Sequence, residues 1–299
     1  MPEASIIRCT ELRKTYGSQE ALRGMTFDVP RGSVFGFLGR NGAGKSTTMK
    51  IMLGMVHPTS GAIEVFGVAA NDPRASVAIR RRTAFVSEEK DLYDYMSVEQ
   101  LLRFAAGLFP SWRADLATHY VKSFGIPRQH RIKSLSQGTR TKLALLLGLA
   151  TGAELLILDE PTTGLDPAAA EAVLHAIIGH VSQEGVTVFL SSHNIAEIDQ
   201  AADHLAIVNN GQVVVTGAID DVRESYRRVR LVFDGAVPQH AVRMLGIEGT
   251  SCDGRVLEFM VKGDAERALL KARALRPISV DVAPVTLKEI FLESVAPEA

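Results

Sequence analysis

The amino-acid sequence predicts an α/β protein with a mainly parallel sheet, an antiparallel N-terminal β subdomain, a helical insert and a small α+β domain at the C-terminus. Three observations predict this fold. Short apolar runs that indicate buried strands alternate with helical patterns through the first 220 residues. A glycine-rich loop at residues 39–47 joins one of these strands to a helix. From about residue 221 the pattern changes to β-α-β-β-α-β, which is typical of a ferredoxin-like domain.

The glycine-rich loop matches the phosphate-binding pattern G-x-x-x-x-G-K-[ST] in full. Its glycines let several backbone N–H groups point at one anion, and the N-terminus of the following helix adds positive potential. In this pattern Lys45 reaches the β- and γ-phosphates, and the Ser46 hydroxyl ligates Mg²⁺. A glycine-rich turn without a ligand is the alternative, which the strand–loop–helix context disfavours. The residues expected to contact a nucleoside triphosphate here are Gly39, Arg40, Asn41, Gly42, Ala43, Gly44, Lys45, Ser46 and Thr47.

Length and composition limit the classes of function. The 299 residues accommodate a large and a small domain, and a hydrophobic content of 46% is ample for a core. A net charge of −1 without a long basic run argues against a dedicated nucleic-acid binder. Cys9 and Cys252 form no close pair and no metal pattern, which favours a reducing compartment. Residues 1–10 lack a signal-peptide pattern, and the most apolar stretch, 143–158, is too short to span a bilayer, so we expect a cytoplasmic protein that is soluble by itself.

The elements of the first half follow from apolar runs and turn residues. Strands are expected at residues 6–12, 25–29, 33–38, 62–66 and 83–86, with turns at 30–32 and 58–61. A helix is expected at 45–55, and the arginines at 80–82 indicate a solvated helix end. Residues 96–124 show helical spacing in two segments, of which Pro110 and Pro127 bound the second. These two segments predict a helical insert.

The second half alternates again and then changes. An apolar helix is expected at residues 142–150, with further helices at 168–181 and 195–201. Strands are expected at 154–160, 186–190, 204–209 and 212–216, the last two joined by the hairpin signal Asn210-Gly211. In the C-terminal domain the expected strands are 229–233, 246–251, 256–261 and 278–282, and the expected helices 239–245, 265–274 and 287–295. The predicted domains are residues 1–220, with the insert at about 92–150, and residues 221–299.

Two acids close the apolar run at residues 155–158. Ligands of parallel sheets lie at the carboxyl ends of the strands, so this strand delivers Asp159 and Glu160 beside the phosphate loop. Adjacent side chains on a strand point to opposite faces, which predicts separate roles. We assign Asp159 to Mg²⁺, through water, and Glu160 to polarising the attacking water. The alternative is a strand that ends in solvated acids. His193, at the tip of another buried strand, is expected to contact the γ-phosphate, although a lone histidine is more often structural.

With these residues in place, the chain resembles the ATPase subunits of ABC transporters over residues 6–225. The resemblance rests on motifs in order: the phosphate loop, the strand ending in Asp159 and Glu160, and His193, which matches the family's switch histidine. Residues 135–139, Leu-Ser-Gln-Gly-Thr, resemble the family's signature Leu-Ser-Gly-Gly-Gln. The remaining matches are Tyr16 at the adenine-stacking position, Glu88 at the Q-loop, and Gly164, Leu165 and Asp166 at the D-loop.

The resemblance implies a working arrangement. Ser136, Gln137 and Gly138 would bind the ATP of a partner, because the family fold places the signature far from its own phosphate loop. Two heads then enclose two ATP molecules with two-fold symmetry, and this chain is expected to pair with a copy of itself or a close relative. The sequence is similar to single-domain subunits of ABC-2-type exporters, which include drug and antibiotic efflux ATPases. We therefore expect a separate transmembrane permease, with Phe109 and Trp112 of the insert as docking candidates or else as ordinary core residues, and a peripheral place on the inner face of the plasma membrane.

The sequence departs from the family pattern at two places. Gln137 and Thr139 replace the usual Gly and Gln of the signature, while Ser136 and Gly138 are retained. Glu88 replaces the Q-loop Gln, so it would still ligate Mg²⁺ but adds negative charge beside the phosphates. Three alternatives stay open: a soluble ABC ATPase acting on ribosomes or nucleic acid, a nucleotide-dependent switch whose C-terminal domain senses a ligand, and the ATPase of an importer.

Overall fold

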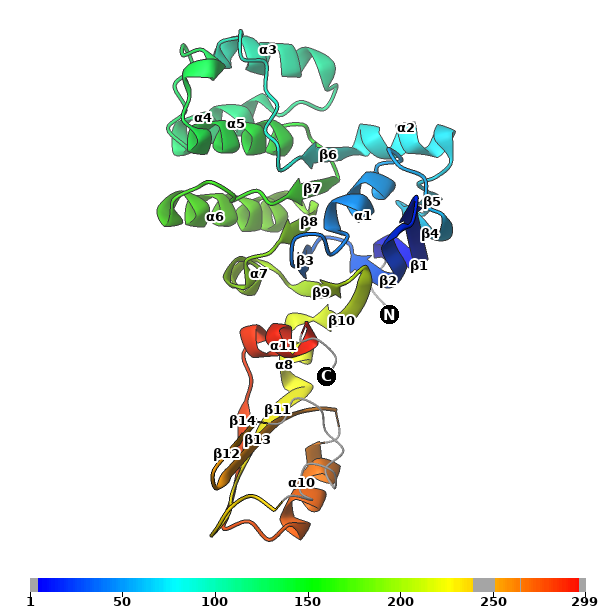
Figure 1. The fold of residues 1–299 in the computed structure, drawn as a ribbon. Helices are drawn as coiled ribbons and strands as arrows, with labels where there is room; N and C mark the ends of the chain where they lie inside the picture. Colours follow the sequence, from blue (N-terminus) through cyan, green and yellow to red (C-terminus); the bar gives the residue numbers. More distant parts are fainter. Residues whose placement is uncertain (1–4, 239–250, 264, 296–299) are drawn as a thin grey trace. The chain divides into compact units, whose positions relative to one another are not determined.

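The computed structural model describes residues 5–238, 251–263 and 265–295, and these residues divide into two compact units (Figure 1). The first unit is Met1–Thr216 and the second is Gly217–Ala299. The predicted helix at 239–245 and most of the predicted strand at 246–251 lie outside the described residues.

The first unit contains two sheets. One is four-stranded, in the order β2-β1-β4-β5, with neighbouring strands antiparallel. The other is six-stranded, in the order β10-β9-β3-β8-β7-β6, and its pairs from β9 to β6 are parallel. The strands are β1 (Ser5–Tyr16), β2 (Gln19–Pro30), β3 (Val34–Gly39), β4 (Ser60–Val65), β5 (Val68–Ala69), β6 (Thr83–Val86), β7 (Leu155–Asp159), β8 (Thr187–Ser192), β9 (His204–Asn209) and β10 (Gln212–Ala218).

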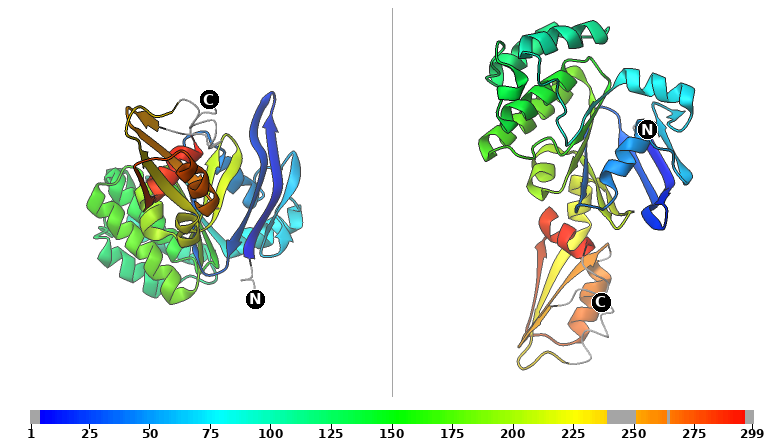
Figure 2. Two further views of the ribbon diagram at one scale, coloured as in Figure 1. Left: turned by 90° about the horizontal axis from the view of Figure 1, so that it is seen from below. Right: turned by 45° about the horizontal axis from the view of Figure 1, so that its top comes forward.

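Helices cover both faces of the six-stranded sheet. Figure 1 and Figure 2 show α1 and the antiparallel sheet on one face, and α6 and α7 on the other. A helical insert of α3, α4 and α5 lies beside β6 and β7. The helices of this unit are α1 (Lys45–Met52), α2 (Pro73–Arg82), α3 (Val98–Leu108), α4 (Ala114–Ser123), α5 (Gln137–Leu149), α6 (Pro167–Glu184) and α7 (Ile195–Ala201), with a short 3-10 helix at Ile132–Ser134. This is the α/β architecture, with insert and antiparallel subdomain, that the sequence predicts.

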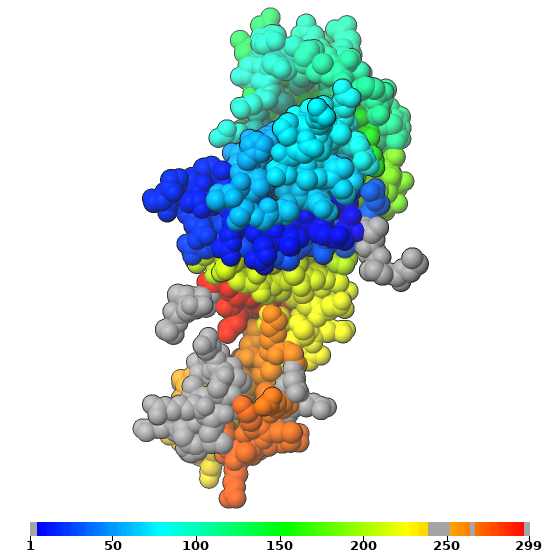
Figure 3. Space-filling model, turned by 90° about the vertical axis from the view of Figure 1, so that its right-hand side faces the viewer, coloured from blue at the N-terminus to red at the C-terminus, as the bar shows by residue number. Residues whose placement is uncertain are grey.

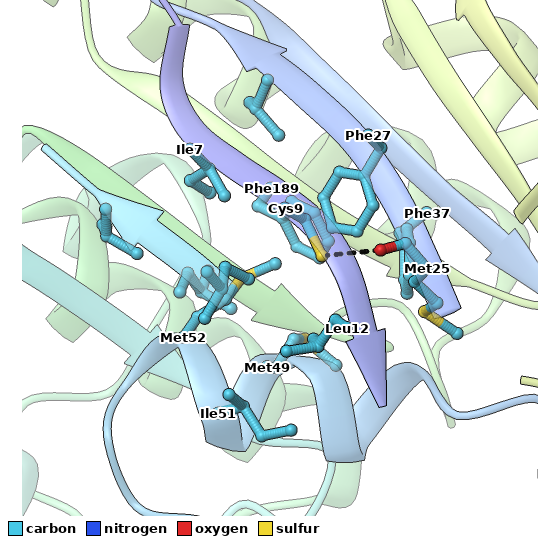
Figure 4. Close-up of a cluster of buried hydrophobic side chains, with 14 of the residues drawn as sticks. Ile7, Cys9, Leu12, Met25, Phe27, Phe37, Met49, Ile51, Met52 and Phe189 are labelled. Atoms are coloured by element: carbon cyan, nitrogen blue, oxygen red, sulfur yellow. Dashed lines mark hydrogen bonds between the residues drawn. The ribbon is translucent and has the colours of Figure 1, made fainter. Parts of the chain in front are cut away.

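The main core lies between the two sheets and α1. Figure 4 shows its centre, where side chains from β1, β2, β3, β8 and α1 interdigitate. Phe37 and Phe189 pack with ring centroids 5.0 Å apart, and Phe27 lies 5.4 Å from Phe37. The buried Cys9 thiol donates to the carbonyl oxygen of Met25 at 3.4 Å, and burial raises the pKa of this thiol to about 12. This core fixes β3 and α1, the two elements that flank the phosphate loop.

Several elements differ from the sequence prediction. The strands predicted at 6–12 and 25–29 are longer, because β1 and β2 continue as a hairpin whose turn has Gly17 at φ +58°. Helix α2 was predicted only at its end, although Asp72 caps it and Pro73 is its first residue. The solvated helix end predicted at 80–82 is confirmed: α2 ends at Arg82, and Arg80, Arg81 and Arg82 are exposed. Two of these arginines also have partners, since Arg80 donates to the carbonyl oxygen of Leu53 and Arg82 pairs with Glu154. Figure 3 shows the face of the molecule on which β1–β2 (dark blue) and α2 (cyan) lie.

The second unit is built on an antiparallel sheet in the order β12-β13-β11-β14. Its strands are β11 (Tyr226–Val232), β12 (Ser251–Asp253), β13 (Val256–Lys262) and β14 (Ser279–Pro284), and its described helices are α8 (Ile219–Glu224), α10 (Ala265–Ala274) and α11 (Leu287–Ser294). A separate apolar cluster, which includes Val229, Leu231 and Phe259, packs against Ala272 of α10. Helix α8 was not predicted, since only two of its six residues are buried.

Candidate functional site

The phosphate loop lies between the buried strand β3 and helix α1, as predicted. Its glycines are sterically required. Gly44 has φ +105°, and a Cβ there would lie 2.6 Å from Leu22 Cδ2. A Cβ at Gly39 would lie 2.7 Å from the carbonyl oxygen of Val208. Gly39 and Gly44 therefore lie too close to their neighbours for a side chain, and the motif predicts that backbone N–H groups at the start of α1 bind an anion.

A cavity of about 610 Å³ opens in front of this loop. Ten of the predicted site residues line it: Tyr16, Asn41, Gly42, Gly44, Lys45, Ser46, Thr47, Glu88, Asp159 and Glu160. The predicted residues that do not line it are Gly39, Arg40, Ala43, Ser136, Gln137, Gly138, Asp166 and His193. Sequence reasoning missed the lining from the β1–β2 hairpin and from the β9–β10 turn: Ser18, Gln19, Glu20, Ala21, Arg23, Asn210 and Gly211.

The Asp159 carboxylate is held by two hydroxyl groups. Ser46 donates to Asp159 Oδ2 at 3.1 Å, and Ser191 donates to Oδ1 at 2.7 Å. A serine hydroxyl at the start of α1 and a carboxylate at the end of β7 thus meet at one point of the cavity. These hard oxygen atoms suit Mg²⁺, which protein sites bind through one or two carboxylates together with substrate phosphates. Among the described residues no cluster of three or more His, Cys, Asp or Glu side chains could hold a metal ion, so the phosphates would have to complete the coordination.

Glu160 is buried and contacts two basic side chains. Lys45 Nζ lies 3.2 Å from Glu160 Oε1, and His193 Nδ1 lies 2.8 Å from Oε2. The residue has a positive φ of 47°, a strained conformation for a glutamate. Oε1 makes no hydrogen bond within the described part of the chain, so its approach to Lys45 is an ion pair without hydrogen-bond geometry. One buried carboxylate oxygen therefore retains capacity to accept a proton or a hydrogen bond.

Lys45 is itself buried, and its ammonium also donates to the carbonyl oxygen of Gly39 at 2.8 Å. Asp159 is the last residue of β7, whereas Glu160 lies beyond the strand with a φ of 47°, so their different partners do not follow from the strand alternation that the sequence suggested. Asp159 faces the serine hydroxyls and Glu160 faces Lys45 and His193. His193, outside the cavity lining, reaches the site through Glu160.

Lys90 is a charged residue at this site that the sequence reasoning missed. Its ammonium donates to the carbonyl oxygen of Ser87 and lies 3.4 Å from the carbonyl oxygen of Asp159. Burial lowers the pKa of Lys90, and the nearby carboxylates of Asp159, Glu88 and Glu160 act in the opposite direction. No local pattern points to Lys90, because its approach to β7 depends on how the chain turns after β6.

The signature residues form the start of α5, five residues before the predicted helix. Ser136 caps this helix by accepting from Thr139 N at 3.2 Å, and the two hydroxyl oxygens lie 2.8 Å apart. A Cβ at Gly138 would lie 3.3 Å from Leu165 Cδ2, so the signature packs on the segment before α6. Asp166 caps α6 by accepting from Ala169 N at 2.9 Å. The structure brings these residues together with one another and not with the cavity of their own chain.

Tyr16 is at the mouth of the cavity with 46% of its surface exposed, and Lys14 Nζ lies 4.8 Å from its ring centroid. A half-exposed ring of this kind offers a stacking surface for a planar base.

In the described residues, no helix is both long and apolar enough for a membrane span.

Comparison with known proteins assigns the family. A family model described as ABC transporter matches residues 22–163. The bacitracin transport ATP-binding protein BcrA of Bacillus licheniformis is 34% identical over 229 residues, which cover 75% of this chain and 74% of that protein. The daunorubicin/doxorubicin resistance ATP-binding protein DrrA of Streptomyces peucetius is 32% identical over 276 residues, 89% of this chain and 80% of that protein.

A solved structure of an ATP-binding subunit of an ABC transporter is 30% identical, with a TM-score of 0.66, and covers 74% of this chain and 92% of that one. The chain therefore belongs to the ABC transporter family, as an ATP-binding subunit that hydrolyses ATP.

Proposed function

We propose that the chain is the ATPase head of an exporter and that hydrolysis takes place in the cavity in front of the phosphate loop. One observation carries this proposal: Glu160, a buried carboxylate in the cavity wall, is held between Lys45 and His193 at 3.2 and 2.8 Å. A carboxylate with an accepting oxygen beside a phosphate loop is placed to polarise water.

In this proposal Glu160 accepts the proton of the water that attacks the γ-phosphorus, and the bond to the leaving oxygen of ADP breaks. His193 holds the Glu160 carboxylate in position through Nδ1 and would contact the γ-phosphate through its other nitrogen. Lys45, now paired with Glu160, would turn its ammonium to the β- and γ-phosphates, which the loop N–H groups also bind. Tyr16 would stack on the adenine.

The residues present fit Mg²⁺. Ser46 and Asp159, whose oxygens lie 3.1 Å apart, would hold it, with Glu88 as a further oxygen ligand from the same cavity. When bound, the ion would neutralise part of the charge on the phosphates. In Glu88 this chain has a carboxylate at a position where the family uses an amide, so ATP binding should depend on the divalent ion more strongly than in a chain with glutamine there.

We propose that a second copy of the chain completes the site. Ser136, Gln137, Gly138 and Asp166 lie outside the cavity of their own chain, which is the arrangement expected if they serve the ATP of a partner. A head-to-tail pair with two-fold symmetry satisfies both sites at once. Thr139 replaces a glutamine of the family pattern, and its hydroxyl lies beside that of Ser136. We expect this contact to alter the strength of closure without removing the anion-binding helix N-terminus.

We further propose that a separate permease docks on the helical insert. Tyr93, Phe104, Leu108 and Phe109 are each 39–59% exposed, and they line a groove of about 320 Å³ that also reaches β6. Exposed apolar side chains around a hollow are typical of a protein interface. Trp112, also considered from the sequence, does not line this groove.

Two further assignments belong to this proposal. The division of the chain at residues 216 and 217 supports a domain boundary near residue 220, and the antiparallel order β12-β13-β11-β14 supports a ferredoxin-like accessory domain.

Since two relatives are named for bacitracin transport and for daunorubicin/doxorubicin resistance, we propose a drug-like or peptide antibiotic as cargo. The head would then act at the inner face of the plasma membrane.

The proposal is tested by ATP turnover of the purified chain. Glu160→Gln keeps the side-chain volume but removes the base, so turnover should fall by about 10²–10⁴-fold while ATP binding persists. Glu64→Gln, the same change at an exposed position of β4, is the matched control and should leave turnover unchanged. If Glu160→Gln hydrolyses ATP at the wild-type rate, the role assigned to Glu160 is wrong.

The docking proposal has its own test. Phe104→Ser and Leu108→Ser should keep the basal turnover of the isolated head, because neither residue lines the nucleotide cavity. Both variants should lose co-purification with membranes that contain the permease. Retention of both variants on such membranes would exclude this groove as the docking surface.

A further inference from the structure

The loop that follows β6 separates two cavities. Glu88 lines the nucleotide cavity, whereas Ser87, Glu89 and Lys90 line the groove of the helical insert. Lys90 is half-buried, and its ammonium donates to Ser87 O and lies 3.4 Å from Asp159 O. The ammonium therefore lies behind the loop, outside the lining of the nucleotide cavity, but against the end of the strand that carries Asp159.

The nucleotide cavity is rich in negative charge where the phosphates would lie. Three carboxylates line it at this point, those of Glu88, Asp159 and Glu160, and Lys45 supplies an ammonium group from the phosphate loop. A triphosphate adds several further negative charges. Because Coulomb energies rise in partly buried surroundings, a third carboxylate without compensation would weaken triphosphate binding strongly.

We propose that Lys90 is the built-in counter-cation of this acidic site: it offsets part of the charge of Glu88 from behind the loop and so limits the loss of ATP affinity that a carboxylate at that position would cause. Lys90 is a positioning residue, since it contacts the backbone of the loop and of β7 and not the substrate. The inference deepens the proposed function and rests on ATP binding in the cavity of the phosphate loop.

Two features argue that charge is the relevant property of this side chain. A neutral donor could also hydrogen-bond to the carbonyl oxygens of Ser87 and Asp159. The residue is nevertheless a lysine, although its burial disfavours the charged form. The ammonium lies 3.4 Å from the carbonyl oxygen of Asp159, at the end of the strand that delivers acids to the cavity, and the carboxylates of Asp159, Glu88 and Glu160 raise the pKa of Lys90 against the effect of burial. An ammonium is retained at a partly buried position when nearby anions compensate for its desolvation, and here those anions are the acids of the site.

The test is calorimetric titration of the full-length chain with ATP, in EDTA and in Mg²⁺. Lys90→Met should weaken ATP binding by about tenfold or more in EDTA, where no other cation offsets the acids, and by less in Mg²⁺. Lys90→Arg keeps the charge and should bind ATP nearly as tightly as the wild type. Lys122→Met, the same change at an exposed position of α4, is the control and should have no effect.

The double variant Glu88→Gln/Lys90→Met distinguishes charge compensation from simple loop anchoring. Removing both charges should restore ATP affinity in EDTA to within about threefold of the wild type, because the two changes are coupled. If Lys90→Met binds ATP as the wild type does, or if Glu88→Gln gives no rescue, the inference is overturned. Loss of ATP binding is expected only for Lys45→Ala. If the wild type itself does not bind ATP, the proposed function is overturned, and not the role of Lys90 alone.

Discussion

Glu160 contacts both an ammonium and an imidazole, at Lys45 and His193, and its neighbour Asp159 contacts two serine hydroxyls. The separation arises where β7 ends, because Glu160 follows the last residue of the strand and has a positive φ. Two carboxylates that are adjacent in the sequence therefore have different partners. The strained backbone of Glu160, with φ +47°, is stabilised by its N–H bonds to Ser191.

The contact between His193 and Glu160 yields a prediction at this scale. His193→Ala removes the group that orients Glu160, so the turnover number should fall by about 10²–10³-fold. Binding of ATP in EDTA should weaken far less than turnover falls, because the proposed contact of His193 with the γ-phosphate adds to those of Lys45 and the loop, and His193 does not line the cavity. Steady-state turnover and calorimetric binding measure the two effects separately. His175→Ala, on the exposed face of α6, is the control; an equal loss in both variants would contradict a specific role for His193.

The sequence predicted those site residues that short motifs define. Lys45, Ser46, Asp159 and Glu160 each follow or end a buried strand, so the local pattern also places them in space. Lys90 was missed, and so were the residues of the β1–β2 hairpin that line the cavity, apart from Tyr16. Their positions depend on contacts between distant segments, such as the bond from Arg23 N to Gly211 O at 2.7 Å, and no spacing in the sequence reports such contacts.

At the scale of elements, helix ends were harder to predict than helix positions. Helix α5 begins at Gln137 and not at 142, because the Ser136 side chain caps a polar first turn that apolar periodicity does not detect. The strands of the large sheet were predicted well, since buried parallel strands are continuously apolar. In β1 and β2, by contrast, exposed polar residues concealed the outer half of the hairpin.

The start of α4 is tied to the end of α6 by Arg113. Its guanidinium binds Glu184 Oε2 at 2.6 Å and Asp115 Oδ2 at 2.7 Å, and the backbone N–H donates to Ala150 O at 2.8 Å. Arg113 lowers the pKa of Asp115 to about 2 and also lowers that of Glu184. These contacts join the helical insert to a helix that covers the large sheet.

The pH dependence of this link has a definite sign. Both carboxylates have a lower pKa in the folded chain than in the unfolded chain, so their contribution is present above their ordinary pKa values and is lost as the pH falls through the folded values. Arg113→Met should lower the midpoint of thermal unfolding near pH 7, and the difference from wild type should shrink between about pH 4 and pH 2. Calorimetric scans at several pH values measure this.

Arg128→Met is the matched control for that experiment, because Arg128 pairs with Glu99 inside the insert and does not reach α6. A difference between Arg113→Met and wild type that stays constant down to pH 2 would show that the stabilisation does not come from the carboxylates. The pairs are partly exposed, so high salt should also reduce the difference at neutral pH.

At the scale of the whole molecule, we propose that one chain carries two complementary halves of an ATP site. The cavity holds the phosphate loop with Asp159 and Glu160, while the signature at Ser136 packs on the segment before Asp166, away from that cavity. A two-fold pair of chains would bring each half against its complement. ATP would then join the two copies, and hydrolysis would release them by removing the γ-phosphate contacts.

Closure of two copies around ATP is tested by the molar mass of Glu160→Gln, measured by light scattering on a sizing column with and without ATP. Loss of the base should trap ATP between two heads, so we expect the monomer mass without nucleotide and twice that mass with ATP. Adding Ser136→Arg, which blocks the signature, should abolish the dimer while leaving ATP binding intact. A Glu160→Gln chain that binds ATP and remains monomeric would contradict closure of two copies around the nucleotide.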